Sequence, residues 1–254
     1  MTPPFPWSLP PRVALRQAAG LLLLFYGAVY GGGLLIQLTP LRQGSPMVSA
    51  LLLGLVMLFA VRSVVRRDVA WRGSLGLGYQ PVGAAVGWSL LGFVGTYVMN
   101  IAVSLGYLAS RGSLAAQAAE RVHWMGVLAD VPAVAILPLA AFVAVWEEMV
   151  FRGFVLGRLR AALPAADTRG ARLRRDALAV LLCALCFGAG HGYQGALGLL
   201  QTTTAGIALG ALAVWRRRIW PAIGAHFAID AFGLVALKVL KRALDAGATL
   251  ALLP

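Results

Sequence analysis

Charged residues are scarce in this chain, and acidic residues are the scarcest of them. Asp and Glu supply 9 of the 254 residues, all charged residues make up 12%, and hydrophobic residues make up 60%. A soluble domain usually has about 25% charged and about 45–50% apolar residues. The composition therefore excludes a sizeable soluble domain and predicts a polytopic membrane protein.

Cysteine is also rare, because only Cys183 and Cys186 are present, in the apolar sequence LLCALCF. Their CxxC spacing is that of thioredoxin-like redox motifs, which need a βαβ context and an accessible thiolate. An apolar membrane segment offers neither. We therefore expect two small buried side chains that pack between helices.

Basic residues outnumber acidic ones, and the formal net charge is +13. Nucleic-acid-binding proteins reach such a charge by gathering basic residues on one face. Here the basic residues lie in loops between apolar runs, where membrane proteins carry their cytoplasmic positive charge. We therefore exclude a nucleic-acid partner.

The distribution of these charges predicts an orientation with the N-terminus in the cytoplasm. The basic residues then inside are Arg12, Arg16, Arg62, Arg66, Arg67, Arg72, Arg158, Arg160, Arg169, Arg172, Arg174, Arg175, Arg216, Arg217 and Arg218. The smaller set outside is Arg42, Arg111, Arg121, Lys238, Lys241 and Arg242.

Apolar runs predict an all-α fold, a polytopic membrane helix bundle of about seven transmembrane helices, within a range of about six to eight. The runs are 18–38, 47–61, 82–108, 131–156, 177–191, 197–215 and 219–240. We divide the chain into N-terminal transmembrane helices with an interfacial segment (1–130), a helical core (131–242) and a short tail (243–254). The triplet Gly31–Gly33 interrupts the first run and predicts close helix packing there.

Three ionisable side chains, Glu147, Glu148 and Arg152, lie in the fourth run, in the sequence WEEMVFR. Each such group costs about 2.5–3.5 kcal/mol at the centre of a membrane helix. On a helix Glu148 and Arg152 share a face and can pair, whereas Glu147 points about 100° away from Glu148. We expect Glu147 to be free for chemistry. The alternative is an ion-pair cluster that only locks the bundle.

Two more polar sets lie inside apolar runs, in the sequences FGAGH and HFAID. The first ends at His191, and the second contains His226 and Asp230, four residues apart on one helix face. Two of the chain's three histidines are thus intramembrane and lie on different helices. Together with the charged residues of WEEMVFR they predict a shared polar cavity.

The order EExxxR, FxxxH and HxxxN/D, each in a membrane helix, resembles the CPBP family of intramembrane proteases. This family includes the type II CAAX prenyl endopeptidases and bacterial Abi-type proteins, and the resemblance covers roughly residues 131–240. It implies that Glu147 activates a water molecule, that His191 orients or deprotonates this water, and that His226 and Asp230 stabilise the oxyanion. The prenyl endopeptidases have Asn where this chain has Asp230. Because an ionised Asp cannot donate a hydrogen bond, Asp230 must be protonated or must instead orient His226.

Zinc offers an alternative mechanism. His191, His226 and Glu147 could form a His₂Glu site with one open position. The HExxH helix of many zinc proteases is absent from the sequence. We expect hydrolysis by glutamate-activated water without an obligatory metal.

These residues predict an intramembrane endopeptidase that hydrolyses a peptide bond in a membrane-anchored or hydrophobic polypeptide. Buried carboxylates and histidines also form proton relays, so a proton-coupled membrane transporter is one alternative. A non-catalytic membrane scaffold or immunity protein is the other. The Ala-, Arg- and Gly-rich composition favours a bacterial inner (cytoplasmic) membrane. We expect the catalytic cavity to open toward the cytoplasmic half of the bilayer.

Overall fold

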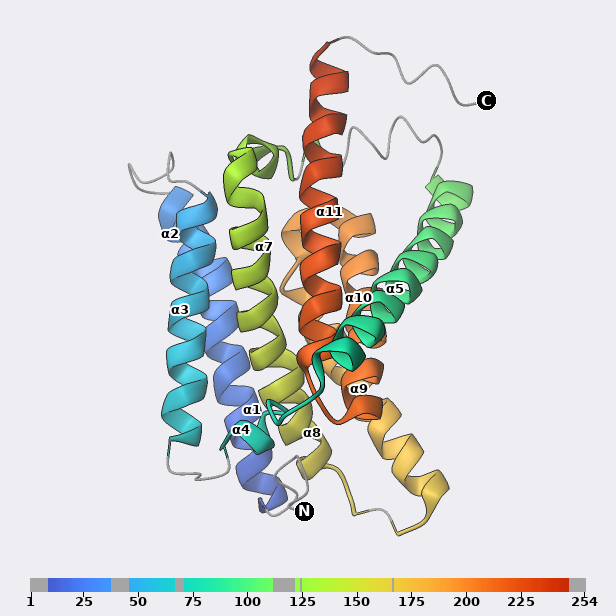
Figure 1. Cartoon of the computed structure of the whole chain (residues 1–254). Coiled ribbons are helices and arrows are strands. Elements are labelled where there is room, and N and C mark those ends of the chain that lie inside the picture. Colours follow the sequence, from blue (N-terminus) through green and yellow to red (C-terminus); the bar gives the residue numbers. More distant parts are fainter. Residues whose placement is uncertain are drawn as a thin grey trace.

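The structure is a computed structural model that describes residues 9–37, 46–66, 71–111, 122–123, 125–165 and 167–246. These residues form helices and turns and contain no strand (Figure 1). The α-helices are α1 (Pro11–Tyr26), α2 (Gly32–Gln37), α3 (Pro46–Val65), α4 (Trp71–Ser74), α5 (Val82–Arg111), α7 (Ala133–Glu148), α8 (Leu156–Ala162), α9 (Arg169–Ala189), α10 (Gly195–Arg216) and α11 (Trp220–Asp245). The π-helical turns are η1 (Gly27–Gly31) and η4 (Met149–Val155), and the 3-10 turns are η3 (Gly126–Asp130) and η5 (Gly192–Gln194).

Among the described residues, six segments are long and apolar enough to cross a membrane, which confirms the predicted polytopic helical bundle. They are Pro11–Leu34, Met47–Val65, Val82–Ser110, Ala133–Ala162, Gly192–Arg216 and Trp220–Asp245. The remaining predicted span, residues 177–191, covers the apolar part of α9 and the two residues after it. The first eight residues of α9, RGARLRRD, are too polar to lie in the hydrocarbon core.

The first span begins at Pro11, well before the predicted start, because proline fits the first position of a helix. It continues through η1 into α2 without leaving the helical path. The predicted close packing at Gly31–Gly33 is wrong, since a Cβ at any of the three would meet nothing within 4 Å. Most of the predicted interfacial segment before residue 130 lies outside the described residues. Its described end, η3, is held by Lys238, whose Nζ donates to the carbonyls of Ala129 and Val131 at 2.8 Å each.

Small residues bring α9 and α10 into close contact. A Cβ at Gly206 of α10 would lie only 2.9 Å from the Cα of Ala184 on α9, so a side chain there would separate the two helices. On the same helix Cys183 is buried, and its Sγ donates to the carbonyl of Phe151 at 3.3 Å. Both cysteines are free, and the predicted packing role is confirmed for Cys183.

The long helices alternate in direction, so the two ends of the bundle differ in their residues (Figure 1). We call the end that carries the start of α1, the end of α8 and the start of α9 the basic end. Its described arginines are Arg12, Arg16, Arg62, Arg66, Arg72, Arg158, Arg160, Arg169, Arg172, Arg174, Arg175, Arg216, Arg217 and Arg218. The opposite end carries the end of α2, the start of α3, η3 and the end of α11.

Candidate active site

The helix that begins at Ala133 changes its geometry where the two glutamates lie. α7 ends at Glu148 and continues into the π-helical turn η4. Such single π-turns occur frequently at functional sites. Arg152, in this turn, is fully buried together with Glu148, and its Nη1 donates to Glu148 Oε1 at 2.6 Å. The predicted pairing of these two residues is confirmed.

Glu148 and Arg152 each have a second partner on another helix. The guanidinium of Arg152 lies 4.3 Å from the ring centroid of Phe187 on α9, which is a cation–π contact. Glu148 Oε1 accepts a second hydrogen bond, from Nδ1 of His226 on α11, at 2.7 Å. This pair therefore ties three helices together and fixes the imidazole of His226.

Glu147 faces the other side of His226. Its Oε2 lies 3.9 Å from Nε2 of His191 and 3.8 Å from Nε2 of His226. Nε2 of His226 lies 3.5 Å from Oδ2 of Asp230, one helical turn further along α11. Within the described part of the chain, buried Glu147 Oε2 has no hydrogen-bond partner. The structure thus brings all six predicted site residues together, with Glu147 between the two imidazoles.

His191 lies two residues after the end of α9 and is oriented by that helix. Its Nδ1 lies 2.8 Å from the carbonyl oxygen of Phe187. Because a carbonyl can only accept, Nδ1 carries the hydrogen and Nε2 presents a lone pair toward Glu147.

Two tyrosines of the first span hold this end of α9. Tyr26 Oη donates to the carbonyl of Cys186 at 2.7 Å, and Tyr30 Oη donates to the carbonyl of Ala189. The carbonyl of Cys186 also accepts from the amide of Gly190 at 3.2 Å, so the tyrosines add to the bonds that fix the turn that carries His191. Neither tyrosine was predicted from the sequence to contribute to the site. Their spacing of four residues in an otherwise apolar run was the only available signal.

A cavity of about 1150 Å³ adjoins the site. Four of the six predicted residues, Glu147, His191, His226 and Asp230, line it. Glu148 and Arg152 do not, and both are fully buried. Tyr193, two residues after His191, lines the cavity as well and was not predicted.

The cavity extends from the site toward the end opposite the basic end. Its walls come from η1 and Gly32–Leu34, the first half of α3, the second half of α5, α7 from Leu139 onward, and the middle parts of α10 and α11. The lining residues Leu34 and Leu52 are exposed. On the basic side, residues 150–155 of η4 are all buried and close the floor. The predicted opening toward the half that carries most of the basic residues is wrong.

The structure explains how residues from different helices reach one depth. Glu147 precedes the end of α8, Ala162, by 15 residues, as many as separate Asp176 from His191 on α9. His226 comes only six residues after the start of α11. α11 starts inside the bundle, since Ile219 is fully buried and its amide donates to the carbonyl of Gly76 at 3.1 Å. Figure 1 shows this start well above the lower ends of α1, α8 and α9.

The alternative zinc set can be tested against this geometry. Zinc needs several ligand atoms at about 2.0–2.2 Å around one point. In the described ranges, no group of three His, Cys, Asp or Glu side chains is arranged to hold a metal ion. His191, His226 and Glu147 as they stand therefore do not fit a zinc site.

Comparison with known proteins agrees with the motif analysis. Curated proteins and solved structures gave no match. A family model does match, and it is described as type II CAAX prenyl endopeptidase Rce1-like. The match covers residues 129–232, the segment that contains all six site residues. Over this segment the chain is therefore similar to the Rce1-like type II CAAX prenyl endopeptidases, which confirms the resemblance inferred from the three motifs.

Proposed function

We propose that this integral membrane protein is an intramembrane endopeptidase, in which Glu147 activates water to hydrolyse a peptide bond. One observation carries the proposal. Glu147 presents a buried, unpaired carboxylate oxygen to a large cavity, at nearly equal distances from two imidazole nitrogens. These separations of 3.8–3.9 Å are too long for a direct hydrogen bond but suit one bridging water molecule.

The proposed reaction uses this water as the nucleophile. Glu147 takes a proton from the water, while the lone pair on His191 Nε2 helps to orient it. The water oxygen attacks the carbonyl carbon of the substrate, and the carbonyl oxygen becomes an oxyanion. The protonated Glu147 then gives its proton to the amide nitrogen as the C–N bond breaks. The products are a carboxylic acid and an amine.

His226 is the proposed donor to the oxyanion. Its Nδ1 is held by Glu148, so its Nε2 can donate only when the ring is protonated. The carboxyl groups of Glu147, Glu148 and Asp230 surround the ring, and such negative charge favours the protonated form. Asp230 therefore acts by orienting and charging His226, and need not donate to the oxyanion itself.

The substrate we propose is a membrane-anchored or hydrophobic polypeptide. A volume of 1150 Å³ exceeds the range of about 300–1,000 Å³ that is usual for small-molecule sites, and the walls are mostly apolar. We further propose that no metal is obligatory. Activity should then survive treatment with EDTA or 1,10-phenanthroline.

The proposed setting is the inner membrane of a bacterium, with the N-terminus in the cytoplasm. The arginines of the basic end support this orientation, because positive charge flanks the cytoplasmic ends of membrane helices. The same placement beside the membrane gives them no role with nucleic acid.

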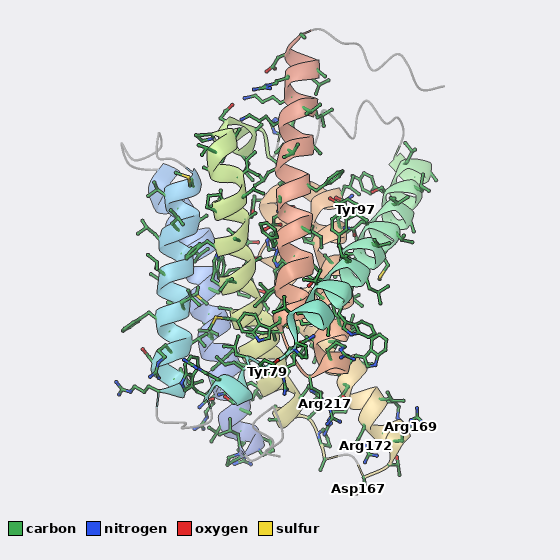
Figure 2. The ribbon with its side chains drawn as sticks, in the orientation of Figure 1. Tyr79, Tyr97, Asp167, Arg169, Arg172 and Arg217 are labelled. Carbon is green, nitrogen blue, oxygen red and sulfur yellow. The ribbon has the colours of Figure 1, made fainter. Side chains whose placement is uncertain are left out.

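The test compares membranes from cells that express the wild type or Glu147→Gln, by proteomics of new peptide termini. Glutamine has the size of glutamate but cannot take the proton, so termini made by the protein should disappear. Asp167→Asn is the matched control, because this exposed acid lies at the basic end, far from the site (Figure 2). All three proteins must accumulate to equal levels.

Termini that vanish with Glu147→Gln and persist with Asp167→Asn would support the protease. Identical profiles for all three proteins would overturn it. A proton-coupled transporter or a non-catalytic scaffold would then be the better explanation of the buried polar cluster.

A further inference from the structure

We infer that the catalytic cavity opens on the extracytoplasmic side of the membrane. The substrate is then an extracytoplasmic part of a membrane-anchored polypeptide. The position of the opening follows from charge and cavity shape alone, whereas the substrate class also depends on the proposed proteolytic function.

The first observation is the asymmetry of charge. The basic end has arginines at six separate places: the start of α1, the end of α3, α4, the end of α8, the start of α9 and the α10–α11 turn. Figure 2 shows Arg169, Arg172 and Arg217 together at this end. Short loops rich in Lys and Arg stay in the cytoplasm during insertion.

The opposite end offers much less positive charge to compete with this signal. Its described basic residues are Arg111, Lys238, Lys241 and Arg242. Lys241 pairs with Asp130 at 2.7 Å, and Lys238 is occupied by two carbonyls of the η3 region. The positive-inside rule therefore puts this end outside.

The second observation is the direction of the cavity. Its lining residues beyond the site belong to the half of the bundle away from the basic end, including Ser49 and Leu52 early in α3, Tyr97 in α5 and Leu128 in η3. Figure 2 shows Tyr97 far above Arg169 and Arg217. No residue of α4 or α8 lines the cavity.

The third observation is a closed floor between the site and the basic end. Phe151, Phe154, Leu75 and Ile219 are each 0% exposed. The carbonyl oxygen of Leu75 would lie 3.0 Å from a Cβ at Gly153, so the loop after α4 is pressed against η4. A polypeptide in the cytoplasm has no path to Glu147 through this layer.

These observations narrow the class of substrate. The reacting bond must reach Glu147 from outside, through a cavity whose exposed wall residues are mostly apolar. This fits the extracytoplasmic flank of a membrane anchor, or a hydrophobic peptide that has already crossed the membrane. It does not fit a lipid-modified tail on the cytoplasmic surface.

The test is the labelling of single cysteines in intact cells by a membrane-impermeant sulfonated maleimide, in a Cys183→Ala, Cys186→Ala background. Ser49→Cys reports the cavity mouth, since Ser49 is exposed and lines the cavity. Val143→Cys reports the interior, one turn before Glu147 on α7. Gly170→Cys reports the basic end, where a Cβ meets nothing within 4 Å and no charge is altered.

We expect Ser49→Cys and Val143→Cys to be labelled in intact cells, and Gly170→Cys only after the membrane is permeabilised. Labelling of Gly170→Cys in intact cells, with protection of Ser49→Cys, would overturn the inferred orientation. If Ser49→Cys is labelled and Val143→Cys is not, the inferred access to the site from outside would be overturned. Cysteine labelling does not require catalysis. The labelling test can therefore fail while the protease test succeeds, and the protease test can fail while the labelling test succeeds. If both succeed, termini that depend on Glu147 should map to extracytoplasmic segments.

Discussion

Glu148 is the side chain on which the arrangement of the site depends, although it does not reach the cavity. One of its oxygens, Oε1, accepts hydrogen bonds from both Arg152 and His226. All three side chains are buried, so each charge relies on the others for compensation. The cluster therefore stabilises the fold, and its proposed part in the chemistry can be separated from this by substitution.

Arg152→Met should destabilise the protein by about 3–5 kcal/mol, because it leaves the buried carboxylate of Glu148 without its cation. The double variant Arg152→Met, Glu148→Gln should recover much of this loss, since both charges are removed together. It should remain inactive, because a neutral amide no longer fixes a protonated His226. Unfolding in detergent and cleavage of a substrate identified by terminus proteomics measure the two effects.

Arg174→Met serves as the control for this series, since Arg174 is an exposed arginine on α9. Arg174→Met should leave both the stability in detergent and the cleavage activity unchanged. Full activity in the double variant would show that the charge cluster only locks the bundle.

The end of α9 is the element that places His191. Its last carbonyls are held from the first span by Tyr26 and Tyr30, and the Phe187 carbonyl fixes the imidazole. The first span lies outside the segment that matches the protease family. The N-terminal part of the chain thus contributes to the site by positioning a residue of the core.

Tyr26→Phe removes one hydrogen bond to this turn, which is worth about 0.5–1.5 kcal/mol. We expect kcat to fall roughly two- to tenfold with KM little changed, because the proposed role of His191 is in the chemical step. Tyr79→Phe is the matched control, an exposed tyrosine near the basic end (Figure 2). A rise in KM with an unchanged kcat would instead place Tyr26 in substrate binding.

Much of the bundle and of the site could be predicted from the sequence. Apolar runs give the spans directly, and the spacing of Glu148 and Arg152 gives their pairing. The π-turn η4 could not be predicted, because it depends on packing around Phe151 and Phe154 and leaves no mark in the spacing.

The end of the bundle toward which the cavity opens could not be predicted from the sequence either. If every helix started at the membrane edge and rose equally per residue, Glu147 and His226 would lie close to the basic end. The structure starts α11 inside the bundle at buried Ile219 and extends α8 well past Arg152. These two changes move the site to mid-depth and close it on the basic side.

A cavity with a single open end predicts one-sided activity in sealed proteoliposomes. Only molecules whose cavity end faces outward should cleave a water-soluble peptide substrate added outside, and detergent should reveal the rest. The active fraction before detergent should equal the fraction of Ser49→Cys molecules labelled from outside. If the protein inserts into the liposomes mostly in one orientation, this active fraction should differ from the fraction of Gly170→Cys molecules that are labelled from outside. Activity that follows Gly170→Cys would mean that substrate enters through the layer formed by Leu75, Phe151, Phe154 and Ile219, and that this layer opens during the reaction.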